Sequence, residues 1–397
     1  MTDEQALYLT LFALYLLECA VWVPRGSAAL ISKASGEAKL RFPRQGVSNN
    51  RGGLVLGPLV PGSGAVFVVP QWPVSIGPDG ALAWVAESLE LEQRAHQNGL
   101  LARFEDAQPT KADARDVMVG DALLATTASA GLARRVADAI EKVRGASGKK
   151  RNAVIDVILT EHVDAEVARR RAEEVWRATS ALRWASLALA GIVFAGAPAA
   201  VMIYGLEVIW LPVLIAVYAA TWTCAALFFR AHKKVFPGAR LERIGQTVLF
   251  ALYPIGAMRA TDAIGRSVLH GVHPLTAAVA LAPPEQQRDL AAHLLRDARF
   301  PRRPVCLNED PAAEAIEAFF REALLRHLTK LAEKAGVSSD QVTAPPAPED
   351  GCLTYCPRCH AQFEKDTEAC SDCGGVPVRS IAGASAEPRA PTPPAAP

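Results

Sequence analysis

Two long apolar runs lie next to each other in the middle of the chain and constrain its fold more than any other feature. They cover residues 184–206 and 208–229; neither contains a charged residue, and Glu207 alone separates them. About 20 helical residues cross the roughly 30 Å hydrocarbon core of a bilayer, so each run is long enough to span it. We therefore predict two transmembrane helices in a hairpin, with the lipid bilayer as their partner.

A third apolar run covers residues 6–23 and is interrupted by Glu18. Its acidic start, MTDEQ, and the lack of an A-x-A cleavage site disfavour a secretory signal, so we predict an uncleaved third transmembrane helix. A further run at 247–258 contains Pro-Ile-Gly and is too short to cross. It is typical of an interfacial or re-entrant segment, and a fourth span is the alternative.

Lysine and arginine gather on one side of each predicted span. In bacterial inner membranes such clusters stay in the cytoplasm. Three spans agree with one arrangement, a multi-pass inner-membrane protein with its N-terminus and Glu207 outside and its C-terminus in the cytoplasm. The clusters are Arg25, Lys33, Lys39, Arg41 and Arg44 after the first span; Arg169, Arg170, Arg171, Arg177 and Arg183 before the second; and Arg230, Lys233, Lys234 and Arg240 after the third.

Two cytoplasmic regions separate the first and second predicted spans. In residues 38–85, short runs rich in valine and leucine alternate with Pro-Gly turn signals, which predicts a small β-meander. Residues 86–183 are rich in Glu, Ala, Arg and Leu with apolar residues three and four apart, which predicts a helical region. The fold class is therefore membrane α-helical with α+β cytoplasmic parts.

Residues 244–341 are predicted to hold the interfacial segment and further cytoplasmic helices. A helix over 310–335 has Asp310 as N-cap, Pro311 in its first turn and Gly336 as its stop. Its apolar stripe favours packing in the protein's own core, with a partner protein as the alternative. A proline-rich linker (342–350) and a disordered Ala/Pro tail (380–397) are also expected. The stripe consists of Ala315, Ile316, Phe319, Phe320, Leu324, Leu325, Leu328 and Leu331.

Five of the eight cysteines fall within residues 352–373. Cys356 with Cys359 and Cys370 with Cys373 form two C-x2-C pairs that are separated by ten residues. Each such turn presents two sulfurs to one ion, and tetrahedral Zn²⁺ takes four thiolates. A redox dithiol is the competing interpretation, but paired motifs in a reducing compartment favour structural zinc.

The two cysteine pairs resemble the C-P-x-C and C-x-x-C-G knuckles of the zinc-ribbon family. The resemblance covers residues 352–378. It implies a small β-hairpin fold held by Zn²⁺ that contacts a protein or stabilises an appendage, and it implies no reaction. Cys352 is a fifth sulfur and His360 an alternative ligand, so the ligand set is left open at this point.

The charge balance disfavours a nucleic-acid partner, because 42 Lys and Arg face 41 Asp and Glu. The expected function is an integral membrane scaffold or adaptor whose ribbon, or whose 310–335 helix, contacts another protein. The alternative is a membrane enzyme or transport accessory with a site near the cytoplasmic interface. Glu18, His270 and His273 are its candidate residues. An ionisable group in an apolar span is a functional candidate, although pairing of Glu18 with Arg25 near the interface also accounts for it. The two histidines are one turn apart if helical, but two histidines are an incomplete metal site, and a capped loop is the simpler interpretation. They match no complete catalytic or metal-binding motif.

Overall fold

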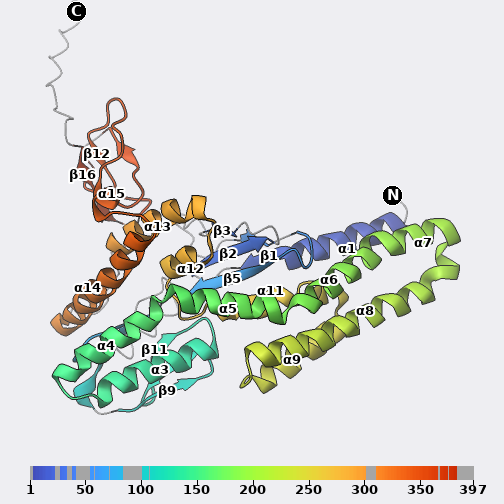
Figure 1. The fold of residues 1–397 in the computed structure, drawn as a ribbon, viewed down its shortest axis with the longest axis horizontal. Helices are drawn as coiled ribbons and strands as arrows, with labels where there is room; N and C mark the ends of the chain where they lie inside the picture. The colour runs from blue at the N-terminus through green and yellow to red at the C-terminus, as the bar shows by residue number, and fades with distance from the viewer. Residues whose placement is uncertain are drawn as a thin grey trace, which may run out of the picture.

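The computed structural model shows a helical protein with several small β-sheets (Figure 1). This agrees with the helical and α+β character expected from the sequence. The described residues are 3–22, 27–33, 38–41, 54–57, 59–70, 72–83, 101–106, 108–300, 310–364, 367–373 and 375–381. The predicted tail beyond Ile381 lies outside them.

The first apolar run forms a helix that ends earlier than predicted. Helix α1 (Asp3–Cys19) has 17 residues, and the chain continues as strand β1 (Ala20–Trp22), which pairs with β4 (Leu54–Leu56). The carbonyl of Cys19 accepts a hydrogen bond from the Gly57 backbone at 2.6 Å, so the chain leaves the helix to join a sheet. The expectation of three helices long enough to span is therefore wrong.

Two helical segments in the described part of the chain are long and apolar enough to cross a membrane, Ser180–Tyr204 and Leu206–Val235. The first consists of α6 (Ser180–Gly191), a π-helical turn η2 (Ile192–Gly196) and α7 (Ala197–Tyr204). Pro198 has no N–H to donate to the carbonyl four residues before it, and the π-turn accommodates this loss. Gly205, at a φ of +77°, reverses the chain into α8 (Leu206–Val235).

The strands form separate sheets rather than one meander. Strands β2 (Ser27–Lys33), β3 (Ala38–Arg41) and β5 (Gly64–Pro70) form an antiparallel sheet in the order β3-β2-β5. Strands β6 (Val74–Ile76), β7 (Gly80–Ala83) and β8 (Leu101–Arg103) form another. Strands within 38–85 thus pair with partners on both sides of that region.

The expected helical region 86–183 is wrong over residues 101–126. Besides β8 and a 3-10 turn (Phe104–Asp106), this segment forms a sheet of β9 (Thr110–Asp113), β10 (Asp116–Val119) and β11 (Ala122–Thr126). Gly120, at a φ of +60°, makes the turn between β10 and β11. Helices begin after this sheet with α3 (Ala130–Gly145), α4 (Lys149–His162) and α5 (Ala165–Ala178).

Seven helices follow α8 in the described residues. They are α9 (Arg240–Leu252), α10 (Pro254–Ala257), α11 (Ala260–Val268), α12 (Pro274–Leu281), α13 (Pro284–Arg299), α14 (Pro311–Lys334) and α15 (Ser339–Thr343). The break at Tyr253 divides the 247–258 run, so it is not a continuous fourth span. Asp310 caps α14 by accepting a hydrogen bond from the Ala312 backbone at 2.9 Å, as predicted.

Two hydrophobic cores lie side by side. In one, α3, α4, α12, α13 and α14 pack with strands β6, β7 and β10; it contains Phe320, Leu324 and Leu328 of the α14 stripe. In the other, α1, β2 and β5 pack with α5, α6 and α8–α11. The α6–α8 hairpin projects from this second core, and the C-terminal module lies at the opposite end of the molecule (Figure 1).

Candidate metal centre

The C-terminal module is built from five strands of two residues each. Strand β12 (Thr354–Tyr355) pairs with β13 (Gln362–Phe363) and with β16 (Arg379–Ser380), while β14 (Ala369–Cys370) pairs with β15 (Val376–Pro377). One Cys-x2-Cys turn follows β12 directly and the other begins at the end of β14. The two small sheets therefore hold the two cysteine pairs.

The four predicted cysteines come together in space. The sulfurs of Cys356, Cys359, Cys370 and Cys373 all lie within 4.8 Å of one another, and the Cys359 and Cys370 sulfurs are 3.8 Å apart. A tetrahedral ion with Zn–S bonds of about 2.3 Å places its sulfurs about 3.8 Å apart. The arrangement is therefore compatible with a zinc-ribbon-like site for one metal ion such as zinc.

The backbone of each turn bends back toward the first cysteine of its pair. The His360 and Gly375 backbone N–H groups donate to the carbonyls of Cys356 and Cys370, both at 2.9 Å. Both residues have a positive φ, +62° and +86°. A histidine adopts this left-handed conformation at a cost, so the geometry of the turn overrides its preference. Gly374 lies outside the described residues.

The surroundings of the thiols shift their pKa values in different directions. Burial raises the pKa of Cys356 to about 11. Burial also acts to raise the pKa of Cys359, but a hydrogen bond from the Ala361 backbone and the neighbouring sulfurs outweigh it, and the net pKa falls below its usual range. A divalent cation offsets the cost of gathering thiolates, because a coordinating thiol loses its proton. The donor set thus fits a metal ion with four protein ligands and no open position.

Two alternative ligands lie outside this cluster. Cys352 is half-buried and stands apart from the four sulfurs. The imidazole of His360 faces helix α13, where Arg296 Nη1 lies 2.9 Å from both ring nitrogens. The structure thus brings together the four cysteines of the two pairs and not the two residues that the sequence left open.

The module is docked on the body of the protein through α13. Arg358, within the first cysteine turn, donates from Nε to Asp297 Oδ1 at 3.0 Å. Phe300 packs against the cluster of buried cysteines, and the Arg379 guanidinium carbon lies 4.9 Å from the centre of its ring. These contacts join segments far apart in the sequence, so no local pattern could have predicted them.

The spacing of the cysteines and the geometry of their sulfurs lead to the same four residues. No family model, curated protein or solved structure matches the chain. What can be said of this site therefore comes from the chain's own residues and the zinc-ribbon resemblance of its cysteine turns.

The residues of the alternative enzyme hypothesis have separate structural partners. Glu18 is in hydrogen-bonding range of Tyr253, in the core next to the hairpin. His270 and His273 belong to the loop before α12, where the His270 Nδ1 lies 2.7 Å from Ser129 Oγ and the His273 Nδ1 accepts from the Leu275 backbone at 3.1 Å. Each histidine therefore has a structural partner, and neither of these contacts involves Glu18.

A third histidine extends this group. His162, at the end of α4, donates from Nδ1 to the Gly271 carbonyl at 2.9 Å, and its ring centre lies 5.7 Å from that of His273. Burial lowers the pKa of His162 to about 4, and that of His270 to about 4 as well. The cluster is therefore held in its neutral form between α4, α3 and α12.

A buried ion pair is the polar feature that sequence reasoning missed. Arg259 and Asp262 are almost fully buried and paired, and Asp262 Oδ1 accepts from the Val66 backbone of β5 at 3.3 Å. A Cβ at Gly57 would lie 2.7 Å from the Arg259 guanidinium, so a larger residue there would require this buried side chain to shift. Oppositely charged residues three apart on a helix look like a surface pair in the sequence, which hides such a cluster.

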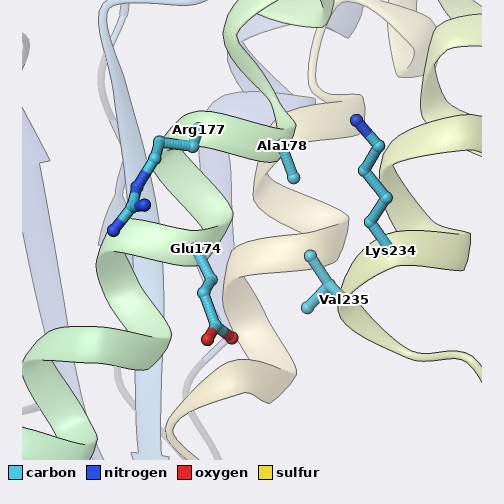
Figure 2. Close-up of a pocket in the computed structure, with 5 residues that line it drawn as sticks. All are labelled: Glu174, Arg177, Ala178, Lys234 and Val235. Carbon is cyan, nitrogen blue, oxygen red and sulfur yellow. The ribbon is translucent and has the colours of Figure 1, made fainter.

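A cavity of about 250 Å³ lies between the end of α5 and the end of α8. Figure 2 shows its lining: Glu174, Arg177 and Ala178 on one side, and Lys234 and Val235 on the other. The Arg177 guanidinium points away from Lys234 and pairs with Glu173 at 3.1 Å. The cavity thus has one carboxylate from α5 and one ammonium from α8 in its lining, at the base of the hairpin.

Proposed function

We propose that the protein is a membrane-anchored scaffold or adaptor: the α6–α8 hairpin crosses the bilayer, and a zinc-loaded ribbon presents a protein-binding surface in the cytoplasm. The observation that carries this proposal is the four-sulfur cluster on a module that is docked to the body. A structural metal site at this position makes the module a rigid platform, and four protein ligands leave no coordination position for a substrate.

The surface of the hairpin supports the membrane anchor. Met202, Ile203 and Val208 are 87%, 71% and 72% exposed, and the adjoining turns carry further large apolar side chains. Such a continuous apolar surface is costly in water and neutral in lipid. Helix α1 packs along the hairpin, with the Tyr15 and Phe194 rings 5.2 Å apart, so we place its apolar side chains in lipid as well.

The basic residues at the hairpin's base support a cytoplasmic body. Arg177 and Arg183 precede the first apolar run of the hairpin (184–206), and Lys233 and Lys234 follow its second (208–229). Positive residues near the ends of spans favour the cytoplasmic side of a bacterial inner membrane. The ribbon lies on the same side, where reducing conditions keep its thiols available to zinc.

A protein is the partner that the ribbon's charges favour. The module exposes Glu364, Glu368 and Asp372, which disfavours nucleic acid and favours a partner protein with a basic patch. The α14 stripe is less suited to this role, because its largest side chains are buried in the core.

Metal analysis of the full-length protein tests the site. We expect about one zinc ion per chain in the wild type and its loss in Cys370→Ser. Cys352→Ser is the matched control, since Cys352 lies in the same module outside the four-sulfur cluster, and it should retain the metal. Equal metal content in all three proteins, or none in the wild type, contradicts the zinc site.

A genetic comparison tests the scaffold function. A chain that ends at Thr343 lacks the ribbon and should lose cellular function while it still reaches the membrane. Glu18→Gln, which removes the charge invoked by the enzyme hypothesis, should keep cellular function. The opposite pattern would overturn the scaffold and favour a membrane enzyme or transport accessory.

A further inference from the structure

Helix α9 has an apolar face that no part of the described chain covers. Leu241, Ile244, Val248 and Leu252 follow at helical spacings on one side, and Leu241 and Leu252 are 86% and 69% exposed. The opposite side packs on α8, where the Phe250 and Phe228 rings lie 4.8 Å apart. The helix is therefore apolar on two faces, and only one of them has a protein partner.

The position of α9 along α8 is fixed by two contacts. Near its start, the Arg243 guanidinium carbon lies 5.0 Å from the centre of the Phe229 ring. Near its end, the Ala251 carbonyl accepts a hydrogen bond from Trp222 Nε1 at 3.2 Å. Trp222 and Phe229 are seven residues apart, or about 10 Å along a helix. Helix α9 thus runs antiparallel to α8, back into the level of the predicted span (Figure 1).

The charges of α9 are confined to the end that lies beside the base of the hairpin. Arg240, Glu242 and Arg243 stand in its first turn, and residues 244–252 carry none. Of the polar side chains further along, Thr247 donates to the Arg243 carbonyl at 2.6 Å within the helix. This gradient, with charges at the headgroup level and apolar residues beyond, is the one a membrane-inserted segment requires.

The return of the chain is also compatible with lipid depth. Tyr253 ends α9, and the short α10 that follows has Ile255, Gly256 and Ala257 buried in the protein. The Tyr253 carbonyl accepts from the Ala257 backbone at 3.0 Å. Non-helical backbone is tolerated at membrane depth only where protein covers it, and α1, α8 and α9 pack around this turn. Helix α11 then re-enters the body beside β5.

We infer that α9 is a re-entrant half-helix whose exposed face (Leu241, Ile244, Val248 and Leu252) is covered by the acyl chains of the cytoplasmic leaflet. This inference rests on the proposed membrane insertion of the hairpin and adds a second embedded element to it. Helix α9 packs on α8, so one lipid phase covers the exposed apolar faces of both. On this inference, the 247–258 run forms two segments that enter and leave the bilayer on the same side.

Photo-crosslinking to lipid tests the inference in the full-length protein. The photoreactive residue p-benzoylphenylalanine is placed singly at Leu252, Val248, Ile215 or Val157, and each protein is reconstituted in vesicles of phosphatidylethanolamine and phosphatidylglycerol. Ile215 reports the hairpin, and Val157, 58% exposed on α4, is the matched control on the body. We expect lipid adducts at Leu252 and Val248 comparable to those at Ile215 and at least about tenfold above those at Val157.

The outcomes separate this inference from the proposed function. Adducts at Ile215 with none at Leu252 or Val248 overturn the half-helix and leave the hairpin inserted. No adduct at any of the four positions overturns the membrane anchor itself. A crosslink from Leu252 to a second copy of the chain, in place of lipid, also overturns the inference. Val248 serves as a second site if the change at Leu252 lowers the yield of folded protein.

Discussion

Helices α8 and α14 are both long and rich in large apolar side chains, yet they meet different surroundings. Helix α8 has 30 residues and exposes Ile215 and Trp222, each at 61%. Helix α14 has 24 residues and buries Phe320 and Leu328 at 2% and 0% exposure. The first is apolar on every side, whereas the second is apolar on one stripe only.

The charges of the two helices explain the difference. Helix α14 carries ion pairs on its outer face, such as Arg326 with Glu322 at 3.1 Å, and this polar face stays in water. Helix α8 has no charge over 208–229, so no face of it is suited to water. Long apolar helices therefore divide into core helices and lipid-facing helices by where their charges lie, and the predictions below test that division.

Acid should unfold the body and spare the hairpin, which is the largest effect expected. Burial lowers the pKa of His162 and His270 to about 4, against an ordinary value near 6.5. Each neutral histidine contributes its full stabilisation above about pH 6.5. This contribution, about 3 kcal/mol for each histidine, is lost as the pH falls toward 4. Urea unfolding of the detergent-solubilised protein, followed by circular dichroism at pH 7.5 and 4.5, measures the loss.

The matched control for the acid effect is His270→Gln, which cannot be protonated. Its unfolding should depend less steeply on pH than that of the wild type. A free energy of unfolding that stays constant from pH 7.5 to 4.5 would contradict the buried neutral histidines.

Removing a large side chain should matter in α14 and not in α8. Phe320→Ala leaves a cavity in the core and should lower the free energy of unfolding by about 3–5 kcal/mol. Ile215→Ala truncates a side chain that the protein does not bury, so the change in detergent should stay within about 0.5 kcal/mol. Denaturant unfolding of both variants measures this. Equal losses would mean that α8 is a core helix.

A charge in the hairpin should hinder insertion. Ile215→Arg should raise the apparent free energy of membrane insertion by about 2.5–3.5 kcal/mol, because the middle of α8 is the predicted centre of a span. Val157→Arg places the same charge on an exposed apolar position of α4 and should have no effect. An insertion assay on the hairpin in its full-length context distinguishes them. An unchanged inserted fraction for Ile215→Arg would count against the span.

The smallest expected effect concerns helix ends: α5 in the body has a side-chain N-cap, whereas the start of α8 has none. Asp164 caps α5 by accepting from the Glu166 and Val167 backbones at 2.9 and 3.1 Å. Asp164→Ala should lower the free energy of unfolding by about 1 kcal/mol, while Asp164→Asn, which keeps the acceptor, should cost less. Equal losses in urea unfolding would indicate that the charge, and not the cap, matters.

Local patterns predicted the parts of the fold that depend on nearby residues. The bounds of α14 follow from Asp310 and Gly336, and the four cysteines follow from their spacing. Residues 101–126 were predicted as helical because their composition resembles that of a helix. Yet the segment also contains a signal for a hairpin. Gly120 turns the chain between β10 and β11, and the strands on either side carry the apolar residues Val117 and Leu124, which are buried.

Other features depend on partners far along the chain, and local patterns were not enough to predict them. Helix α1 ends at Cys19 because β1 pairs with β4, although Val21 and Trp22 are residues that favour strands. The contact of Arg358 with Asp297 joins the ribbon to α13 across segments that no periodicity links. The sequence could therefore indicate the metal ligands but not the way in which their module is held.

If the protein acts as the proposed membrane scaffold, the docked ribbon fixes the distance between the bilayer and a bound partner. Arg358 and Phe300 hold the module on α13. The proline-rich segment is in turn bonded to the module, since Gln362 Nε2 donates to the Ala347 carbonyl at 2.8 Å. The segment predicted as a linker is thus held against the module by a hydrogen bond. A protein that binds the ribbon would be kept at a constant height above the lipid surface, as by a spacer of fixed length.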